Sequence, residues 1–358
     1  MNETIFCKGG SQYITKLIDE SVKNGTRMAT VQGNWEVDEA IRIPGDFTLV
    51  LDGCHLRMAD GCFSNLFVNE HHDTEIGKTL QGTDKNISII GKNKAILDGG
   101  EFNGLSEKTQ LTNGLPPIWK NHILFFTNVD GFKIENVSFH NQRYWALDFI
   151  YCRNGRISDI DFKGCDIWVD ENGKHHHGLS LARYAEILVK TADGIDIRCG
   201  CHDIEIENIT GFVEDDSVAI NACGGDLVET FSVDGLSPDI YSITVKNVRT
   251  ASLCNNVRLL NQGEAKMHDI LIDGVYDSSA ESPHMERGGC SVRIGDPHIY
   301  YARQSTYDDT YNITIKNVRS RALYAIGLAG GIGNLVLDNV ECFDGAEQIC
   351  VAFKDRHG

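Results

Sequence analysis

Positive charge, long apolar runs and proline are all scarce in this sequence. Lys and Arg total 33 against 51 Asp and Glu, which gives a net charge of −18. This balance argues against nucleic acid or an anionic membrane as a partner. No stretch approaches the ~18 consecutive apolar residues of a transmembrane helix. With only 6 prolines and no Pro- or Ser-rich linker in 358 residues, we expect one domain over residues 1–358.

Features of exported proteins are also missing. The opening segment, MNETIFCKGGSQYITKLIDE, has no cationic stretch followed by an apolar run, as a signal peptide would. The 12 cysteines are scattered without tight pairing, which is typical of small buried residues in a reducing compartment rather than of a disulfide framework. We therefore predict a cytoplasmic protein; secretion stays open if a signal peptide has been removed.

A short unit with β-branched residues at alternate positions recurs along the chain. It reads FKIENVSF, IEIENITG, ITVKNVRT, ILIDGVYD, ITIKNVRS and LVLDNVEC. Period-two patterns of Ile and Val that return every few tens of residues predict short strands stacked as a solenoid.

A second repeat interleaves with the first and shares one frame. Its first residues are Asn121, Trp145, Asp193, Asp216, Asn255, Cys290, Tyr324 and Glu347. The steps between them are 24, 48, 23, 39, 35, 34 and 23 residues, so a rung without long loops takes 23 or 24 residues. This length predicts a right-handed parallel β-helix, whose rungs are ~4.8 Å apart. Ile14, Leu17, Ile18 and Val22 have helical spacing and predict a capping helix over about residues 11–25.

Three aspartates occupy a special place in this frame. Asp193 and Asp216 hold equivalent positions one bare rung apart, and Asp215 adjoins Asp216. Because a carboxylate that points inward would be costly to bury unpaired, we expect all three at a turn just before a strand. Carboxylates this close cannot all ionise cheaply, so at least one pKa should rise. A protonated carboxyl beside ionised ones suits glycoside hydrolysis.

These segments resemble the polygalacturonase-like glycoside hydrolases of family 28. TADGIDI, EDDSVAI and NNVRLL match the family's Asn-Thr-Asp, Gly/Gln-Asp-Asp and Arg-Ile-Lys motifs over a region of about residues 80–350. The resemblance implies inverting cleavage of pectic or related glycosidic bonds. It also implies Asp215 as general acid, Asp193 and Asp216 as the pair that activates water, and Arg258 as a substrate-binding residue.

The sequence departs from the family's pattern at three places. Ala192 replaces the threonine, Leu260 replaces the lysine, and no Gly-His-Gly occurs between Asp216 and Arg258. In the family, that histidine and lysine are associated with the catalytic subsite and the substrate carboxylate. The departures weaken an assignment as a simple polygalacturonase and leave the aspartate trio intact.

The third position after each frame residue points outward and reads Asp148, Asp196, Ala219, Arg258 and Arg293 on successive rungs. We expect Arg258 and Arg293 beside the trio, where guanidinium groups can bind sugar carboxylates and hydroxyls. An equal alternative is that the two arginines only balance the negative charge of this acidic face. Trp145 and Asn256 are further candidate substrate-binding residues. The position of Trp145 in the frame is equally consistent with packing in the core. Cys199, Cys201 and His202 lack a second ligand pair, so we predict a cysteine column and no metal.

These features together predict an enzyme: an inverting glycoside hydrolase that acts on an oligo- or polysaccharide without a cofactor. Two alternatives stay open. A β-helix polysaccharide lyase or epimerase would remove a proton next to a carboxylate, and a non-catalytic carbohydrate-binding module would bind sugar without turnover. The sugar, its linkage and the oligomeric state are left open by the sequence.

Overall fold

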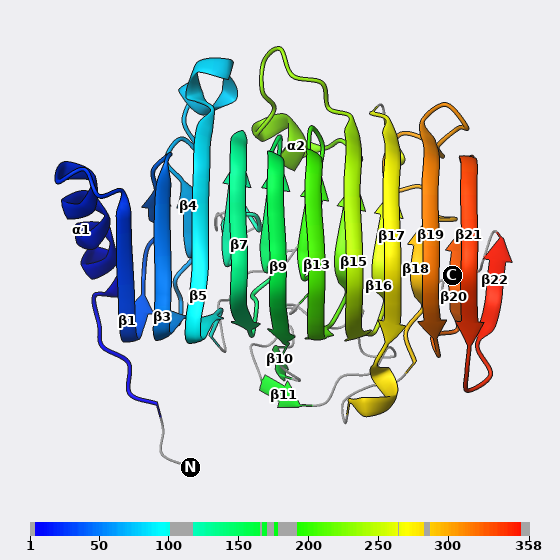
Figure 1. Cartoon of the computed structure of the whole chain (residues 1–358), viewed down its shortest axis with the longest axis horizontal. Helices are drawn as coiled ribbons and strands as arrows, with labels where there is room; N and C mark the ends of the chain where they lie inside the picture. Colours follow the sequence, from blue (N-terminus) through cyan, green and yellow to red (C-terminus); the bar gives the residue numbers. More distant parts are fainter. Residues whose placement is uncertain are drawn as a thin grey trace.

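The chain winds into two facing parallel sheets, as Figure 1 shows for the computed structural model. The structure describes residues 4–100, 117–164, 167–169, 175–177, 192–263, 265–282 and 287–351. The first sheet, with long strands, contains in spatial order β1 (Met28–Val37), β3 (Phe47–Met58), β5 (Asp84–Asp98), β7 (Val129–His140), β9 (Arg153–Lys163), β13 (His202–Val213), β15 (Ile240–Ser252), β17 (Met267–Asp277), β19 (Thr310–Ser320) and β21 (Gly333–Cys342).

The second sheet has shorter strands and carries the site described below. It contains in spatial order β2 (Ile41–Ile43), β4 (Phe67–Asn69), β6 (Leu124–Thr127), β8 (Leu147–Ile150), β12 (Ile195–Arg198), β14 (Asp216–Asn221), β16 (Asn255–Leu260), β18 (Cys290–Ile294), β20 (Tyr324–Leu328) and β22 (Glu347–Val351). Because one long and one short strand make each rung, the predicted right-handed parallel β-helix is confirmed.

Asparagines in the recurring unit form a corner within five of the long strands, β7, β13, β15, β19 and β21. Asn136, Asn208, Asn247, Asn317 and Asn339 all have φ between 50° and 58°, the left-handed conformation that Asn tolerates better than most residues. Their side chains also bridge rungs: the Asn247 amide donates to Asn208 Oδ1 at 3.2 Å, and the Asn339 amide donates to Asn317 Oδ1 at 2.8 Å. The asparagine of the repeat thus makes a bend on these strands, and Asp159 and Gly274, also with positive φ, take the equivalent place on β9 and β17.

The second repeat sets the register of the short sheet. Asp216 pairs with Asn255, Asn255 with Cys290, Cys290 with Tyr324, and Tyr324 with Glu347. Two places after the frame position on five successive rungs, the side chains point inward and are fully buried: Ile195, Val218, Val257, Val292 and Ile326. Ile349, on the last described rung, is 45% exposed. The frame read from the sequence is therefore the register of the sheet from Trp145 to Glu347. At Asn121 the frame is wrong by one residue, because Leu124 and not Ile123 pairs with Leu147.

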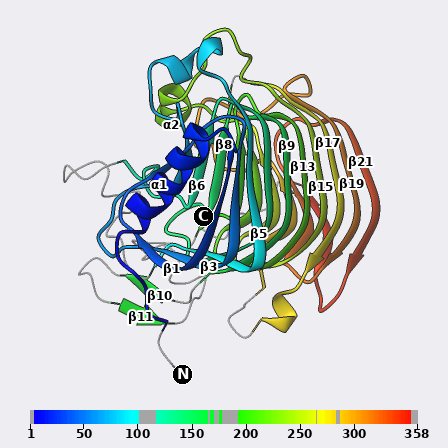
Figure 2. The same cartoon turned by 60° about the vertical axis from the view of Figure 1, so that its left-hand side comes forward.

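Helix α1 (Gly10–Lys23) covers the N-terminal end of the coil, as Figure 2 shows. Ile14 and Ile18 are buried on its inner face, and the Tyr13 ring stacks on the Trp35 ring of β1 at 4.2 Å between centroids. The predicted capping helix is confirmed, with bounds one or two residues earlier than expected. It protects the first rung from pairing with another chain.

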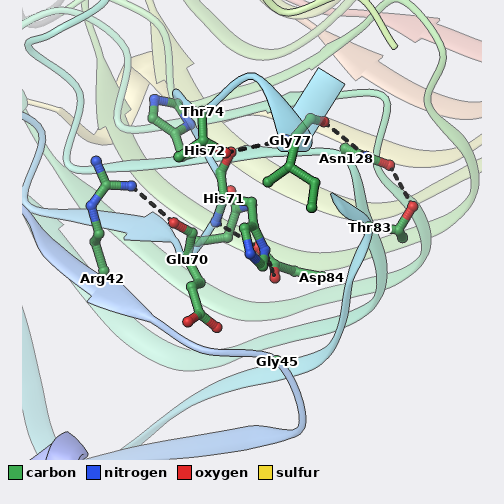
Figure 3. Close-up of polar contacts among 12 residues, drawn as sticks. Arg42, Gly45, Glu70, His71, His72, Thr74, Gly77, Thr83, Asp84 and Asn128 are labelled. Atoms are coloured by element: carbon green, nitrogen blue, oxygen red, sulfur yellow. Dashed lines mark hydrogen bonds and ion pairs between the residues drawn. The ribbon is translucent and has the colours of Figure 1, made fainter. Parts of the chain in front are cut away.

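Loops project from the ends of the short strands. They carry the 3-10 turns η1 (Ile76–Lys78), η2 (Leu80–Gly82) and η5 (Ser279–Glu281), helix α2 (Asp226–Thr230) and the antiparallel pair of β10 (Ile167–Val169) and β11 (His175–His177). Asn128 fixes the η1–η2 loop, because its amide donates to the Gly77 carbonyl at 2.9 Å (Figure 3). The same amide donates to the Thr79 carbonyl at 2.9 Å. None of the helices among the described residues has the length and apolar character to cross a bilayer.

Candidate active site

The rung frame brings Asp193, Asp215 and Asp216 together at the start of two neighbouring short strands. The Gly194 N–H donates to the Asp216 carbonyl at 2.9 Å, and the Asp215 N–H donates to the Ala192 carbonyl at 3.1 Å. These backbone bonds hold the turn before β12 against the turn before β14. One carboxylate oxygen of each aspartate lies within 4.8 Å of one from each of the other two.

This closeness corrects one expectation about geometry. Rungs ~4.8 Å apart and the opposite directions of adjacent residues predict that the acid Asp215 stands ~6.5–9.5 Å from the other two carboxyls, the spacing of many inverting enzymes. The carboxylate oxygens instead lie within 4.8 Å. Adjacent residues on one strand diverge, but the backbone bonds of both turns draw Asp193 and Asp215 onto the same rung junction. The spacing therefore gives no support for inversion.

Two members of the trio are buried and tethered. Asp193 Oδ1 accepts the Asp216 N–H at 2.9 Å. Asp216 Oδ1 accepts the Asn255 amide at 2.6 Å, and its Oδ2 lies 3.4 Å from Arg258 Nη1. Asp215 is only half-buried. Asp215 is thus the member of the trio with most access to the cleft.

Burial and mutual repulsion raise the pKa values of the two buried members. The pKa of Asp193 is raised well above its usual value by burial, with further contributions from Asp196, Asp215 and Asp216. Burial, followed by the charge of Asp215, raises the pKa of Asp216 to about 6, against the lowering effect of Arg258. The expected rise in a pKa of the trio is confirmed. Asp193 and Asp216 therefore favour the protonated form more than an exposed aspartate does.

The trio lines a cleft of about 550 Å³ on the outer face of the short sheet. The cleft follows the strands from Asp193 and Asp216 to Arg198, Asn221 and Leu260, a span of roughly 16 Å at ~3.3 Å per residue. Aromatic rings line it too: Tyr144, Trp145, Tyr300 and Tyr301. Aromatic faces beside carboxylates form a surface suited to a sugar, which has both apolar and hydroxyl faces.

Of the two arginines predicted for this face, Arg258 lines the cleft and Arg293 does not. Both are in the predicted register, since Arg258 pairs with Ala219 and with Arg293 across the sheet. Their guanidinium groups share the buried carboxylate of Asp296, which Arg258 Nη2 contacts at 2.9 Å. Arg293 is thus part of the charge balance that holds Arg258 beside Asp216.

Arg198 is a second cleft arginine that the sequence argument missed. Its guanidinium lies 4.4 Å from the centre of the Trp145 ring, and its Nη1 contacts Asp196 Oδ1 at 3.2 Å. The outward side of β12 includes position 198 as well as position 196, so strand alternation alone could have found it. The trio therefore lies between the Arg198 guanidinium on β12 and the Arg258 guanidinium on β16.

A second pair of buried carboxylates lies beside the trio. Asp148 and Asp196 are paired across β8 and β12, and both side chains are fully buried. Burial raises the pKa of Asp148 to about 7 against the lowering effect of Arg198, and it raises the pKa of Asp196 well above its usual value. His122 Nδ1 lies 3.6 Å from Asp148 Oδ2, and burial lowers the pKa of this histidine well below its usual value. The Arg198 guanidinium is thus the positive charge that lowers the pKa of both buried carboxyls.

Trp145 lies in the cleft, whereas Asn256 is not among the residues that line it. Trp145 lines the cleft and stacks on Tyr144 at 4.6 Å between ring centroids, so it is available for contact with a sugar. Asn256 is buried, and its amide donates to the carbonyl and hydroxyl oxygens of Thr250 at 2.7 and 3.0 Å. The prediction of Asn256 as a substrate-binding residue was wrong, because its side chain holds a rung corner. Its neighbour Asn255 is the one that contacts the trio.

Two groups of side chains in the described residues have the closeness of metal ligands: the aspartate trio, and Glu70 with His71 and Asp84. In the second group, drawn in Figure 3, Asp84 Oδ1 contacts His71 Nδ1 at 2.7 Å. Its Oδ2 accepts the Asn69 amide and the His71 N–H at 2.7 and 3.0 Å. Both oxygens of this buried carboxylate are therefore satisfied by the protein itself.

The eleven cysteines of the described residues are free thiols. Cys201 and Cys152 stack on neighbouring rungs, since the Cys152 N–H donates to Cys201 Sγ at 3.3 Å. Cys201 thus packs in the core with Cys152, whereas the Cys199 thiol donates to the Cys223 carbonyl at 3.4 Å. The predicted column of Cys199 and Cys201 on one side is wrong, because the chain turns after β12 and ends the strand alternation.

No protein-family model and no curated protein match this sequence. The structure is similar to solved β-helix proteins. They include a polygalacturonase from Erwinia carotovora, with a TM-score of 0.55 and 14% identity over 98% of this chain and 97% of that one. A mutant tailspike protein of E. coli bacteriophage HK620 in complex with a pentasaccharide has a TM-score of 0.59 and 14% identity over 95% of this chain. The A-module of a mannuronan C-5 epimerase from Azotobacter vinelandii has a TM-score of 0.57 and 12% identity over 95%.

These likenesses concern the fold. This chain spans 61% of the tailspike chain and 75% of the epimerase module. At such identities, the fold is shared and the chemistry has to be argued from the site itself.

Proposed function

We propose that this protein is a glycoside hydrolase of the polygalacturonase-like kind that cleaves a glycosidic bond in an acidic oligo- or polysaccharide. The observation that carries the proposal is the trio: three carboxylates with oxygens within 4.8 Å, in an open cleft lined by aromatic rings and arginines. The fold likeness to a polygalacturonase and to a tailspike in complex with a pentasaccharide supports a saccharide ligand.

The exposure of each carboxyl suggests its role. Asp215 reaches the cleft, so it donates the proton to the leaving glycosidic oxygen. Asp193 and Asp216 are buried and tethered, which keeps them from attacking the anomeric carbon and suits them to hold a water molecule. The water loses a proton to this pair as its oxygen bonds to the anomeric carbon, and the bond to the leaving oxygen breaks.

A water nucleophile gives inversion at the anomeric carbon. The tethering of Asp193 and Asp216 favours the water nucleophile, whereas the spacing of the carboxyls does not. The proton that the pair takes from water passes to Asp215, where it replaces the one given to the leaving oxygen and restores the starting state.

The arginines favour an acidic sugar. Arg258 lies beside Asp216, and Arg198 lies under Trp145 on the other side of the trio. Guanidinium groups bind carboxylates in a directed, bidentate manner. Since Leu260 stands where the related enzymes have a lysine, we propose that these two arginines take over recognition of the substrate carboxylate.

The experiment is a screen of pectic and other uronate-containing oligosaccharides, with neutral oligosaccharides beside them, for release of reducing ends. The wild-type protein should release reducing ends from at least one acidic substrate, and the Asp215→Asn variant should not. An unsaturated product that absorbs in the ultraviolet would indicate a lyase instead. Sugar binding that persists without turnover after loss of all three aspartates would indicate a binding module.

A further inference from the structure

A second pocket continues the cleft at the C-terminal ends of the same strands. Its volume is about 490 Å³, within the range of ligand pockets in general. Cys199 comes directly after β12, which ends at Arg198, and Ala222 comes directly after β14, which ends at Asn221, so each wall of the cleft runs on into the pocket. Tyr301 lines both spaces. The two spaces are therefore successive sections of one groove.

The lining changes in character from one section to the next. The cleft contains three carboxylates and two guanidinium groups. The pocket is lined by small and apolar residues: Cys199, Ala222, Gly224, Gly225, Val228, Pro238, Gly263, Ala265 and Ala302, with Ser232, Glu229 and Tyr301. Burial raises the pKa of the Cys199 thiol to about 12, so that wall is uncharged. Among the described residues no Lys, Arg or His lines the pocket.

This contrast decides what the pocket can accept. A further uronate would meet the charge of Glu229 with no cation to pair with, and its carboxylate would lose water without a replacement partner. An apolar group gains free energy by leaving water for the same walls. Glycines leave the space open: a Cβ at Gly224 would meet no atom within 4 Å, and one at Gly225 would approach the Tyr301 ring at 3.2 Å.

We propose that this pocket binds an uncharged apolar group, an aryl or alkyl substituent, at the end of the saccharide whose sugars lie in the trio cleft. The inference rests on the proposed function, since it takes the trio cleft as the place of the sugars. It adds that the substrate is a conjugate with one acidic and one apolar end, rather than a uniform polyuronate.

The test measures binding without turnover. The probes are 4-methylumbelliferyl and methyl glycosides of galacturonic acid, galactose and glucose, each as mono- and disaccharide, titrated calorimetrically into the full-length Asp215→Asn protein. For at least one sugar the aryl glycoside should bind ~10-fold or more tightly than its methyl counterpart, as expected for burial of an aromatic ring.

Two variants fill the pocket from different sides. A Cβ at position 224 meets no atom within 4 Å and the backbone there has no left-handed φ, so Gly224→Leu adds volume from a position that accepts a side chain. Ser232→Trp adds volume from the exposed loop after α2. Both should abolish the preference for the aryl glycoside, whereas Gln348→Leu, an exposed position on β22, should retain it. Circular dichroism melts confirm that each variant is folded.

Three results would overturn the proposal. The first is no preference for the aryl probe with any sugar, and the second is a preference that survives both filling variants. The third is that Gly224→Leu weakens the binding of aryl and methyl disaccharides equally, which would place a sugar in the pocket. A preference that both filling variants abolish, in a protein that hydrolyses nothing, would support the apolar pocket and refute the hydrolase. Hydrolysis without the preference would do the reverse.

Discussion

Replacing Asp148 by asparagine should stabilise the fold at alkaline pH. The Asp148 side chain is fully buried beside Asp196, and Arg198 is the guanidinium next to the pair. Asparagine keeps the shape and removes the charge. Its effect should depend on pH, because the carboxyl it replaces changes its charge near neutrality.

The sign follows from the direction of the pKa shift. Burial raises the pKa of Asp148 from 3.8 to about 7 in the folded protein. The folded state therefore holds a proton that the unfolded state has released, and this stabilising contribution is complete below pH 3.8 and lost as pH rises to 7. A shift of this size corresponds to an upper bound of roughly 4 kcal/mol above pH 7; coupling to Asp196 and Arg198 reduces it.

The assay compares thermal unfolding of wild type and Asp148→Asn at pH 5 and pH 8. We expect the variant to melt several degrees above wild type at pH 8, with a much smaller difference at pH 5. Asp19→Asn, at an exposed position on α1, is the matched control and should show no such pH dependence. Equal stabilisation at both pH values, or a loss at pH 8, would refute a buried carboxyl that ionises near neutrality.

Three further predictions concern the trio and the cysteines. Asp193→Asn, Asp215→Asn and Asp216→Asn should each lower kcat by ~10²–10⁴-fold while the melting curve survives; near wild-type turnover in any of them would remove that residue from the mechanism. Activity should rise with pH through about 6, as Asp216 ionises to accept a proton from water, and a rate that is flat from pH 4 to 7 would contradict this role. Thiol titration of denatured, unreduced protein should find nearly all 12 cysteines free, as we propose for a reducing compartment, whereas several protected pairs would indicate export.

The sequence predicted the register of the short sheet because each rung follows the same local rule. Alternate β-branched residues must point into the coil, so the frame from Asp193 to Glu347 could be read without knowledge of the loops. The same rule placed Asp148, Asp196, Ala219, Arg258 and Arg293 in one outward row, which the strand pairing confirms.

The walls of the cleft could not be predicted in the same way. Tyr300 and Tyr301 reach it from an exposed stretch after β18 that has no periodic pattern. The role of Asn256 was misjudged because two adjacent asparagines have opposite directions on a strand, and only the hydrogen bonds show which one meets the trio. The spacing of the carboxyls depended on backbone bonds between two turns, which sequence distance does not encode.

The most direct test of the central claim follows the oxygen and the anomeric configuration of the product. The reaction is run in H₂¹⁸O on a substrate from the reducing-end screen, with mass spectrometry of the products and proton NMR of the first-formed anomer. We predict one ¹⁸O at the new reducing end and inverted configuration, because a water held by Asp193 and Asp216 attacks the anomeric carbon. Products without ¹⁸O, retained configuration or a glycosyl-enzyme trapped on any of the three aspartates would contradict the mechanism.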